Sequence, residues 1–216
     1  MLRTRTPPGD RSNRPRAAAG SRQRALDAAL ALFEAQGVAN TTIEEVRDRS
    51  GVSIGSLYHH FGSRDGLVAA LFDDLLAGYR AHIMAALKDS TDARALLEGF
   101  VAAHIGWAVA HPAAARFLSE QRRNPVITRG EAKLQQGTAE FLRPLLARLR
   151  PAISAGTIRS LPPELLLSLA IGPVQTWTRL WLNGQTALKP ETAARRLGEL
   201  VWAAIAVPST YPGRKS

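Results

Sequence analysis

The stretch GVSIGSLYHHF, residues 51–61, holds two glycines, two serines, a tyrosine and a pair of histidines. Three kinds of site use such residues: a phosphate-binding loop, a metal site and the second half of a helix-turn-helix. A phosphate-binding loop ends in Lys followed by Ser or Thr, whereas Leu57 and Tyr58 stand in that place. His59 and His60 are adjacent, so on a helix they point about 100° apart and form a poor chelate. The stretch therefore favours the helix-turn-helix.

The residues before this stretch supply the first helix of such a motif. Thr42 can cap a short helix, and Glu45 stands where it completes a capping box. Gly51 then breaks the helix, and Ser53 is placed to cap a second helix over residues 54–61. Two short helices joined in this way form a helix-turn-helix, whose second helix enters the DNA major groove.

The two sides of the second helix differ in a way that suits groove contact. On a helical wheel, Phe61 and Ile54 lie within about 60° of Leu57, so this side packs inward, and Ile54 at the helix start also suits contact with a thymine methyl. The outward side combines close backbone approach, a hydroxyl and flat rings with polar tips. It consists of Gly55, Ser56, Tyr58 and His59. A helical hairpin without special function explains this exposed face less well.

Residues 21–71 closely resemble the DNA-binding domain of the tetracycline-repressor (TetR) family. The matching elements are Thr41-Thr42-Ile43, Gly51-Val52-Ser53, Gly55, Leu57-Tyr58, His60-Phe61, Ser63-Arg64 and Leu67. Arg47, Ser50 and Gly66 depart from the family's pattern, which leaves the packing between the helices open.

The resemblance implies a homodimer that reads a near-palindromic operator in double-stranded DNA and responds to a small-molecule effector. It implies phosphate contacts from Thr42, Tyr58 and Arg64, and base contacts from Gly55, Ser56 and His59. His60 stays open between packing and phosphate contact. The expected DNA-binding residues are Thr42, Ser53, Ile54, Gly55, Ser56, Tyr58, His59, His60 and Arg64.

Helical periodicity without strand-like alternation predicts an all-α fold of about nine helices. The first helix begins at Ser21 and ends at Gly37, and the fourth follows a cap at Ser63 and reaches about Leu87. Breaks that contain proline, including one at 150–151, separate the later helices. These later helices are expected at 92–110, 112–122, 130–150, 163–183 and 190–207. The expected domains are a disordered basic arm (1–20), a DNA-binding domain (21–66, motif about 42–61), a ligand-binding and dimerisation domain (67–207) and a tail (208–216).

Charge is distributed unevenly along the 216 residues, whose net charge is +10. Residues 1–24 carry seven arginines and one aspartate, a net charge of +6, whereas residues 25–66 have a net charge of −3. A basic chain suggests a polyanionic partner. The N-terminal arm is therefore expected to supply most of the positive charge near the motif if it folds onto phosphates, although a merely solvated tail explains it equally well.

The later helices carry two groups of candidate residues. Phe100, His104 and Trp107 share one helix face, which fits either a ligand pocket or a packed core with one satisfied histidine. The candidate pocket residues are Phe100, His104, Trp107, Phe117 and Trp177. The last two helices are strongly apolar, as the resemblance implies for a dimer interface and as buried helices require. The candidate interface residues are Leu166, Leu169, Trp181, Leu197, Val201 and Trp202.

Other classes of protein receive little support. The chain has no Cys, hence no disulfide and no thiolate metal site. No apolar run reaches the roughly 18 residues of a membrane span, and a cytoplasmic protein is expected. We find no nucleophile–base arrangement, so we expect neither an enzyme nor a cofactor or metal. The main hypothesis is a ligand-responsive transcriptional regulator, most simply a repressor; the alternative is a helical small-molecule carrier without specific DNA binding.

Overall fold

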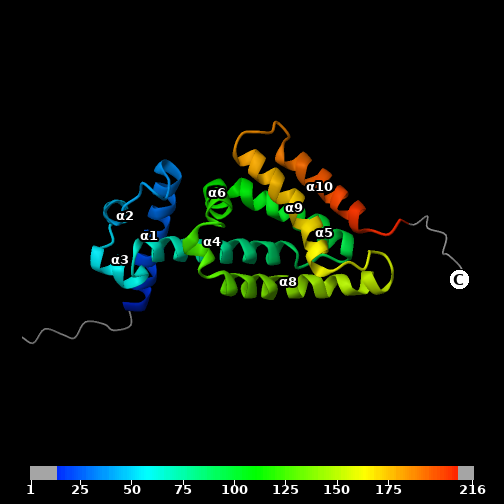
Figure 1. The fold of residues 1–216 in the computed structure, drawn as a ribbon, viewed down its shortest axis with the longest axis horizontal. Coiled ribbons are helices and arrows are strands. Elements are labelled where there is room, and N and C mark those ends of the chain that lie inside the picture. Colours follow the sequence, from blue (N-terminus) through cyan, green and yellow to red (C-terminus); the bar gives the residue numbers. More distant parts are fainter. Residues whose placement is uncertain (1–13, 209–216) are drawn as a thin grey trace, which may run out of the picture. The chain divides into compact units, whose positions relative to one another are not determined.

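The computed structural model describes residues 14–208, which form ten helices and an isolated bridge between Ile158 and Ala206 (Figure 1). The all-α prediction is therefore confirmed. The helices are α1 (Arg14–Gln36), α2 (Ile43–Ser50), α3 (Ile54–Phe61), α4 (Arg64–Ala86), α5 (Ala93–Ala110), α6 (Pro112–Gln121), α7 (Pro125–Thr128), α8 (Glu131–Ser154), α9 (Pro163–Leu182) and α10 (Pro190–Ile205).

The chain forms two compact units that divide inside α4, the first ending at Asp73 and the second beginning at Asp74. In the first unit, α1 packs on α2 and α3. Apolar residues at helical spacing on each of these helices meet in one small core, and Leu26, Val46 and Leu57 are almost fully buried there. This packing fixes the outward side of α3, because the side chains opposite Leu57 must face solvent.

The first helix is longer than predicted. It begins at Arg14 rather than at Ser21, so the expected disorder is wrong for residues 14–20. Ala17, Ala18 and Ala19 have high intrinsic helix propensity and extend a helix that packing already holds downstream. The rest of the expected arm, residues 1–13, and most of the expected tail, residues 209–216, lie outside the described residues.

In the second unit, α5 lies at the centre and packs most extensively on α10, with α9 and α8 against it as well. The two helices approach closely at Gly198, where an added Cβ would lie 3.3 Å from Glu98 Cγ and 3.4 Å from its Cα. The core along α5 is closed by Val101 and Ile105, which are 0% and 2% exposed.

Two details of α7 and α8 depart from the prediction. The short helix α7 was not expected, and α8 continues through Pro144 and Pro151 to Ser154 instead of ending at residue 150. A proline costs the helix one hydrogen bond. Burial of Leu145 and Leu149 offsets this cost, because tertiary packing overrides local propensity.

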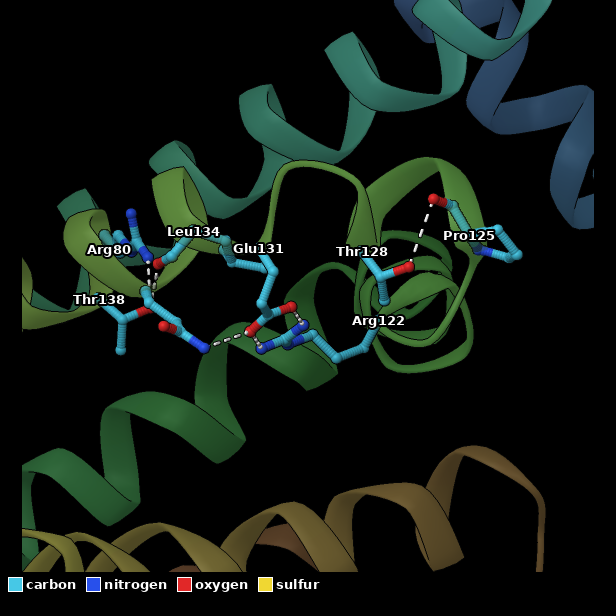
Figure 2. A network of polar contacts seen from close by, with 8 residues as sticks. Arg80, Arg122, Pro125, Thr128, Glu131, Leu134 and Thr138 are labelled. Carbon is cyan, nitrogen blue, oxygen red and sulfur yellow. Dashed lines mark hydrogen bonds and ion pairs between the residues drawn. The ribbon is translucent and has the colours of Figure 1, made fainter.

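Polar contacts hold the beginning of α8 against its neighbours (Figure 2). Arg122, just after α6, makes a bidentate ion pair with Glu131, with N···O distances of 3.0 and 3.1 Å. Two turns further along α8, Thr138 Oγ1 accepts a hydrogen bond from Arg80 Nη2 of α4 at 3.0 Å. The ion pair lowers the pKa of Glu131, because the adjacent guanidinium stabilises the carboxylate.

Candidate functional site

The capping box that precedes the motif is confirmed. Thr42 Oγ1 accepts a hydrogen bond from the Glu45 N–H at 3.2 Å, and the Glu45 carboxylate accepts one from the Thr42 N–H at 2.7 Å. Gln36 Nε2 also donates to this carboxylate at 3.1 Å, a contact that the sequence did not indicate. The hydrogen bonds from the Thr42 backbone and then from Gln36 lower the pKa of Glu45. They also fix the start of α2 on the end of α1.

The turn between α2 and α3 depends on one glycine. Gly51 has φ 65°, in the left-handed region, and its N–H donates to Arg47 O at 2.9 Å. A side chain at this backbone conformation is strained, which explains the glycine. Ser53 then caps α3 as predicted, because its Oγ accepts from the Ser56 N–H at 3.3 Å.

The outward side of α3 is where the helical wheel predicts it. Leu57 is 1% exposed, whereas Tyr58 is 50% exposed and Gly55 and His59 are exposed too. A Cβ added at Gly55 would meet no atom within 4 Å, so this position is open on its outer side. The remaining predicted positions of the helix, Ile54 and Ser56, are half-buried at its rim.

His60 belongs to the packed side of the helix rather than to its free face. Its Nε2 lies 3.0 Å from Ser21 Oγ of α1, and its ring lies 5.8 Å from that of Phe61, centroid to centroid. The histidine pair thus divides into an exposed His59 and a half-buried His60 that joins α3 to α1.

Arg64 makes contacts that the sequence did not suggest. Its Nε donates to Thr41 O at 2.7 Å, and its Nη2 donates to Val38 O. Both acceptors belong to the connection between α1 and α2, where the carbonyls beyond the end of α1 need donors. The guanidinium thereby ties the start of α4 to this connection.

The second unit contains a small apolar cavity of about 40 Å³. Nine leucines, one just after α4 and the others from α5, α8 and α9, line it together with Phe100, Ala170 and Ile171, and no polar surface contributes. We call it the leucine cavity. Of the five predicted pocket residues, only Phe100 lines it. Phe117 and Trp177 are buried elsewhere in this unit, and Trp177 stacks on Trp181 at 6.2 Å.

A polar pair joins α4 to α5 one turn beyond the Phe100 end of this cavity. Tyr79 Oη and His104 Nδ1 are 2.8 Å apart, and the Tyr79 ring makes edge contacts with both His104 and Trp107. Burial lowers the pKa of His104 to about 4 and raises that of Tyr79, so both side chains are neutral at pH 7. Tyr79 and the leucines were missed from the sequence, because only the packing of distant helices brings them together.

Comparison with known proteins identifies the architecture. Residues 25–71 match the family model described as "Bacterial regulatory proteins, tetR family". Over 145 residues the chain is 30% identical to the HTH-type transcriptional repressor KstR2 of Rhodococcus jostii, which covers 65% of this chain and 69% of that protein. The chain belongs to the TetR family.

Two solved structures extend the likeness to the whole fold. A TetR-family regulator from Marinobacter aquaeolei superposes with a TM-score of 0.75 at 18% identity, covering 89% of this chain and 98% of the other. The regulator FadR of Bacillus subtilis, solved with stearoyl-CoA, gives 0.73 at 17% identity, covering 85% and 98%. As a member of the TetR family, this chain is a DNA-binding transcriptional regulator, and its relatives are transcriptional regulators.

The predicted interface residues of this regulator fall into three groups: buried, half-buried and exposed. Leu166 and Val201 are buried in the protomer's own core, at 5% and 2% exposed. Trp181, Leu197 and Trp202 are half-buried against that core, and Leu169 is exposed. The large apolar side chains that do face solvent on α9 and α10 are Leu165, Leu169, Leu180 and Leu200.

Between residues 14 and 208, no group of three or more His, Asp or Glu side chains is arranged to hold a metal ion. None of the helices in that range is both long and apolar enough to span a membrane.

Proposed function

We propose that this TetR-family regulator represses transcription as a homodimer that binds a palindromic operator through α3 and leaves it when an apolar effector binds. The observation that carries the proposal is the two-sided structure of α3. Its inner side is buried, while Gly55, Tyr58 and His59 form a free face that no part of the described chain covers. A capped helix with a small, hydrogen-bonding outer face suits a DNA major groove.

In this docking, some residues of the motif contact phosphates and others contact bases. Thr42 and Tyr58 reach phosphate oxygens, and Gly55, Ser56 and His59 lie against base edges. Ser53 and Ile54 approach the same strand from the helix start. Arg64 contributes by fixing the α1–α2 connection, where its described hydrogen bonds go, and any phosphate contact is additional to these.

The homodimer is proposed to form through the exposed leucines of α9 and α10. Leu165, Leu169 and Leu180 lie within about 60° of one another around α9, so they make one stripe. Leu200, which is 64% exposed, adds an apolar residue on α10. Exposed apolar stripes mark association sites, and two-fold symmetry matches a palindrome. Size-exclusion chromatography with light scattering should show a dimer that Leu165→Glu with Leu169→Glu separates into monomers.

The effector is proposed to bind in the leucine cavity. The cavity is entirely apolar, which suits the body of a lipid-like molecule. FadR of Bacillus subtilis was solved with stearoyl-CoA, but its identity to this chain is low, so the cavity of this chain carries the argument. A volume of about 40 Å³ holds only a few atoms, hence an effector must push the surrounding helices apart. That expansion is what would couple binding to DNA release.

The coupling route is α4. This helix runs without interruption from Arg64, beside the reading helix, to Ala86, and the next residue, Leu87, lines the cavity. Expansion of the cavity would favour a second position of α4 and shift the dimer away from the spacing of two major grooves. An effector that prefers this state by a few kcal/mol suffices to release the operator.

A competition gel shift tests the proposal. Labelled DNA from upstream of the gene is challenged with unlabelled upstream DNA or with bulk DNA of the same length. We expect upstream DNA to compete at far lower concentration, and binding to weaken steeply with salt. Equal competition by both DNAs would favour the carrier alternative, in which the motif no longer reads sequence.

A further inference from the structure

Two neighbouring side chains of α9 carry buried polar atoms without a hydrogen-bond partner among the described residues. These atoms are Trp177 Nε1 and Thr178 Oγ1. The two side chains are only 8% and 6% exposed. Buried polar groups are almost always paired, since an unpaired one keeps its full desolvation penalty. An indole N–H can only donate, so any group that satisfies Trp177 must offer an acceptor atom.

The Tyr79–His104 pair offers further hydrogen-bonding atoms. Its 2.8 Å contact uses Nδ1 of the imidazole, so Nε2 lies on the opposite edge of the ring. The part of the chain that the structure describes gives Nε2 no hydrogen-bond partner. A neutral imidazole has one donor and one acceptor nitrogen, and a phenol can do both. The pair can therefore adapt to either a carbonyl or a hydroxyl group.

His104, with its partner Tyr79, and the pair Trp177 and Thr178 lie beyond the same end of the leucine cavity, outside its lining. His104 is one turn beyond Phe100 on α5, and its ring lies 6.5 Å from that of Phe100, centroid to centroid. On α9, Trp177 and Thr178 lie two turns beyond Ala170, which lines the cavity. Helix α9 runs in the same direction as α5, because its end meets α6, where Arg116 donates to Leu182 O at 2.8 Å. We call Tyr79, His104, Trp177 and Thr178 the polar layer.

No ionised side chain belongs to this layer. Two cations lie next to it in the chain: Arg179, which follows Thr178 and is exposed, and Arg80, whose guanidinium carbon lies 5.8 Å from the Phe141 ring centroid and whose Nη2 donates to Thr138. The Arg80 guanidinium is engaged on α8. Burying a carboxylate beside a neutral tyrosine, histidine and tryptophan would cost desolvation without a paired charge.

We propose that the effector of this regulator is an uncharged molecule with an acyl-chain or fused-ring body, which fills the leucine cavity, and one carbonyl or hydroxyl oxygen, which hydrogen-bonds in the polar layer. This inference rests on the proposed effector site and adds its chemical selectivity. The oxygen accepts from Trp177 Nε1 and from the Thr178 hydroxyl, which pairs both orphaned atoms, and the Tyr79 hydroxyl is a further donor to it. The leucines supply binding energy, and the polar layer selects among apolar compounds.

Three matched probes test this inference on the full-length protein: 2-tridecanone, tridecane and dodecanoate. Binding is followed by tryptophan fluorescence and checked by calorimetry. We expect 2-tridecanone to bind about tenfold more tightly than tridecane, since one or two hydrogen bonds distinguish them. Dodecanoate should bind more weakly than the ketone at pH 7.

Two conservative variants localise the selectivity. Tyr79→Phe and Trp177→Phe each remove one hydrogen-bonding atom and keep an aromatic ring, so the ketone should lose about fivefold in affinity while tridecane loses little. Leu145→Phe, which fills the cavity instead, should weaken all three probes. Melting curves of each variant show whether the fold is retained.

The results of these binding experiments test the chemical class of the effector separately from its role in releasing DNA. The inference is overturned if ketone and hydrocarbon bind equally, if no probe binds, or if dodecanoate binds best and Arg80→Gln abolishes its binding. Ketone binding that leaves operator affinity unchanged would support the chemistry of the site and contradict its role in release. Operator binding by a protein that binds none of the probes would contradict the chemistry of the effector site and support the proposed DNA binding.

Discussion

The two units of this regulator hold their functional residues in opposite ways. In the first unit, the proposed DNA-reading site is a free helix face whose position depends on short-range contacts, such as Thr42 with Glu45 and Ser53 with Ser56. In the second unit, the proposed effector site lies among packed helices and depends on residues distant in the chain, such as Tyr79 with His104. Reading DNA therefore needs a rigid, exposed element, whereas sensing a ligand needs an interior that can open.

A pair of glycine variants gives the sharpest test of rigidity in the reading unit and the largest expected effect. A Cβ at Gly66 would overlap the carbonyl oxygen of Phe61, so Gly66→Ala must shift the α3–α4 junction. We expect it to destabilise this unit by about 3 kcal/mol and to abolish operator binding. Thermal melts and gel shifts measure both effects.

The control for this variant is Gly55→Ala on the outer face of α3. Its Cβ meets nothing, so stability should stay equal or rise by about 0.5 kcal/mol, while DNA affinity falls because the backbone can no longer approach the groove. If Gly66→Ala melted and bound DNA like the parent protein, the α3–α4 junction would not need glycine at this position.

The buried His104 of the second unit makes the stability of the protein depend on pH. Burial holds the pKa of His104 at about 4, whereas an unfolded histidine has a pKa of about 6.5. Between about pH 4 and pH 6.5, the unfolded state therefore binds this proton and the folded state does not. The contribution of His104 to the free energy of unfolding is complete above about pH 6.5 and is lost as the pH falls towards 4. We expect a loss of about 2 kcal/mol from this residue.

Denaturant melts at pH 7 and pH 4.5 measure this loss, with His104→Gln as the reference because it keeps a polar side chain that does not titrate. The parent protein should lose more stability than the variant between the two pH values. Carboxylates titrate in both proteins and cancel. Identical losses would mean that His104 is protonated in the folded state, which contradicts its burial.

Tyr58 tests whether the exposed face of α3 contacts phosphate. Tyr58→Ala should weaken binding to operator and to unrelated DNA by a similar factor, about tenfold, because a phosphate contact carries no sequence information. His59→Ala should instead change the preference among operator variants. Unchanged affinity of the Tyr58 variant for both DNAs would argue strongly against the docking of α3.

The smallest expected effect concerns the N-terminal arginines. Residues 14–20 belong to α1, so a clean truncation removes residues 1–13 with Arg3, Arg5 and Arg11. Operator affinity should fall, and the slope of log K against log salt should flatten by up to about 3. Replacement of the three arginines by Gln in the full-length chain should reproduce the result. An unchanged slope would show that these residues do not contact DNA.

Much of the reading unit was predictable from sequence, because caps and glycine turns are encoded within four residues of one another. The box of Thr42 and Glu45, the turn at Gly51 and the inward Leu57 all follow from local spacing. What failed there was long-range: Arg64 donates to carbonyls 23 and 26 residues away, and Gly66 is required by the carbonyl of Phe61. The sequence left His60 open between packing and phosphate contact, and its Ser21 partner was not foreseeable.

The effector unit was predictable only as a set of helices. Aromatic residues drew attention to Phe100, His104 and Trp107, yet the cavity is built mainly from leucines on three helices and just after a fourth. In sequence, a leucine that lines a cavity cannot be told from any other core leucine. Likewise, Leu166 and Val201 have the spacing of an interface but pack into the protomer. The end of α8 beyond Pro151 was missed because packing outweighed a local break.

The most direct test of the central claim is the affinity of the full-length protein for its own upstream DNA relative to bulk DNA, measured by competition at physiological salt. A chain that reads DNA through α3 should prefer the upstream fragment by at least about 10³-fold. A ratio near one, with the protein folded and dimeric, would contradict sequence-specific reading of DNA through α3.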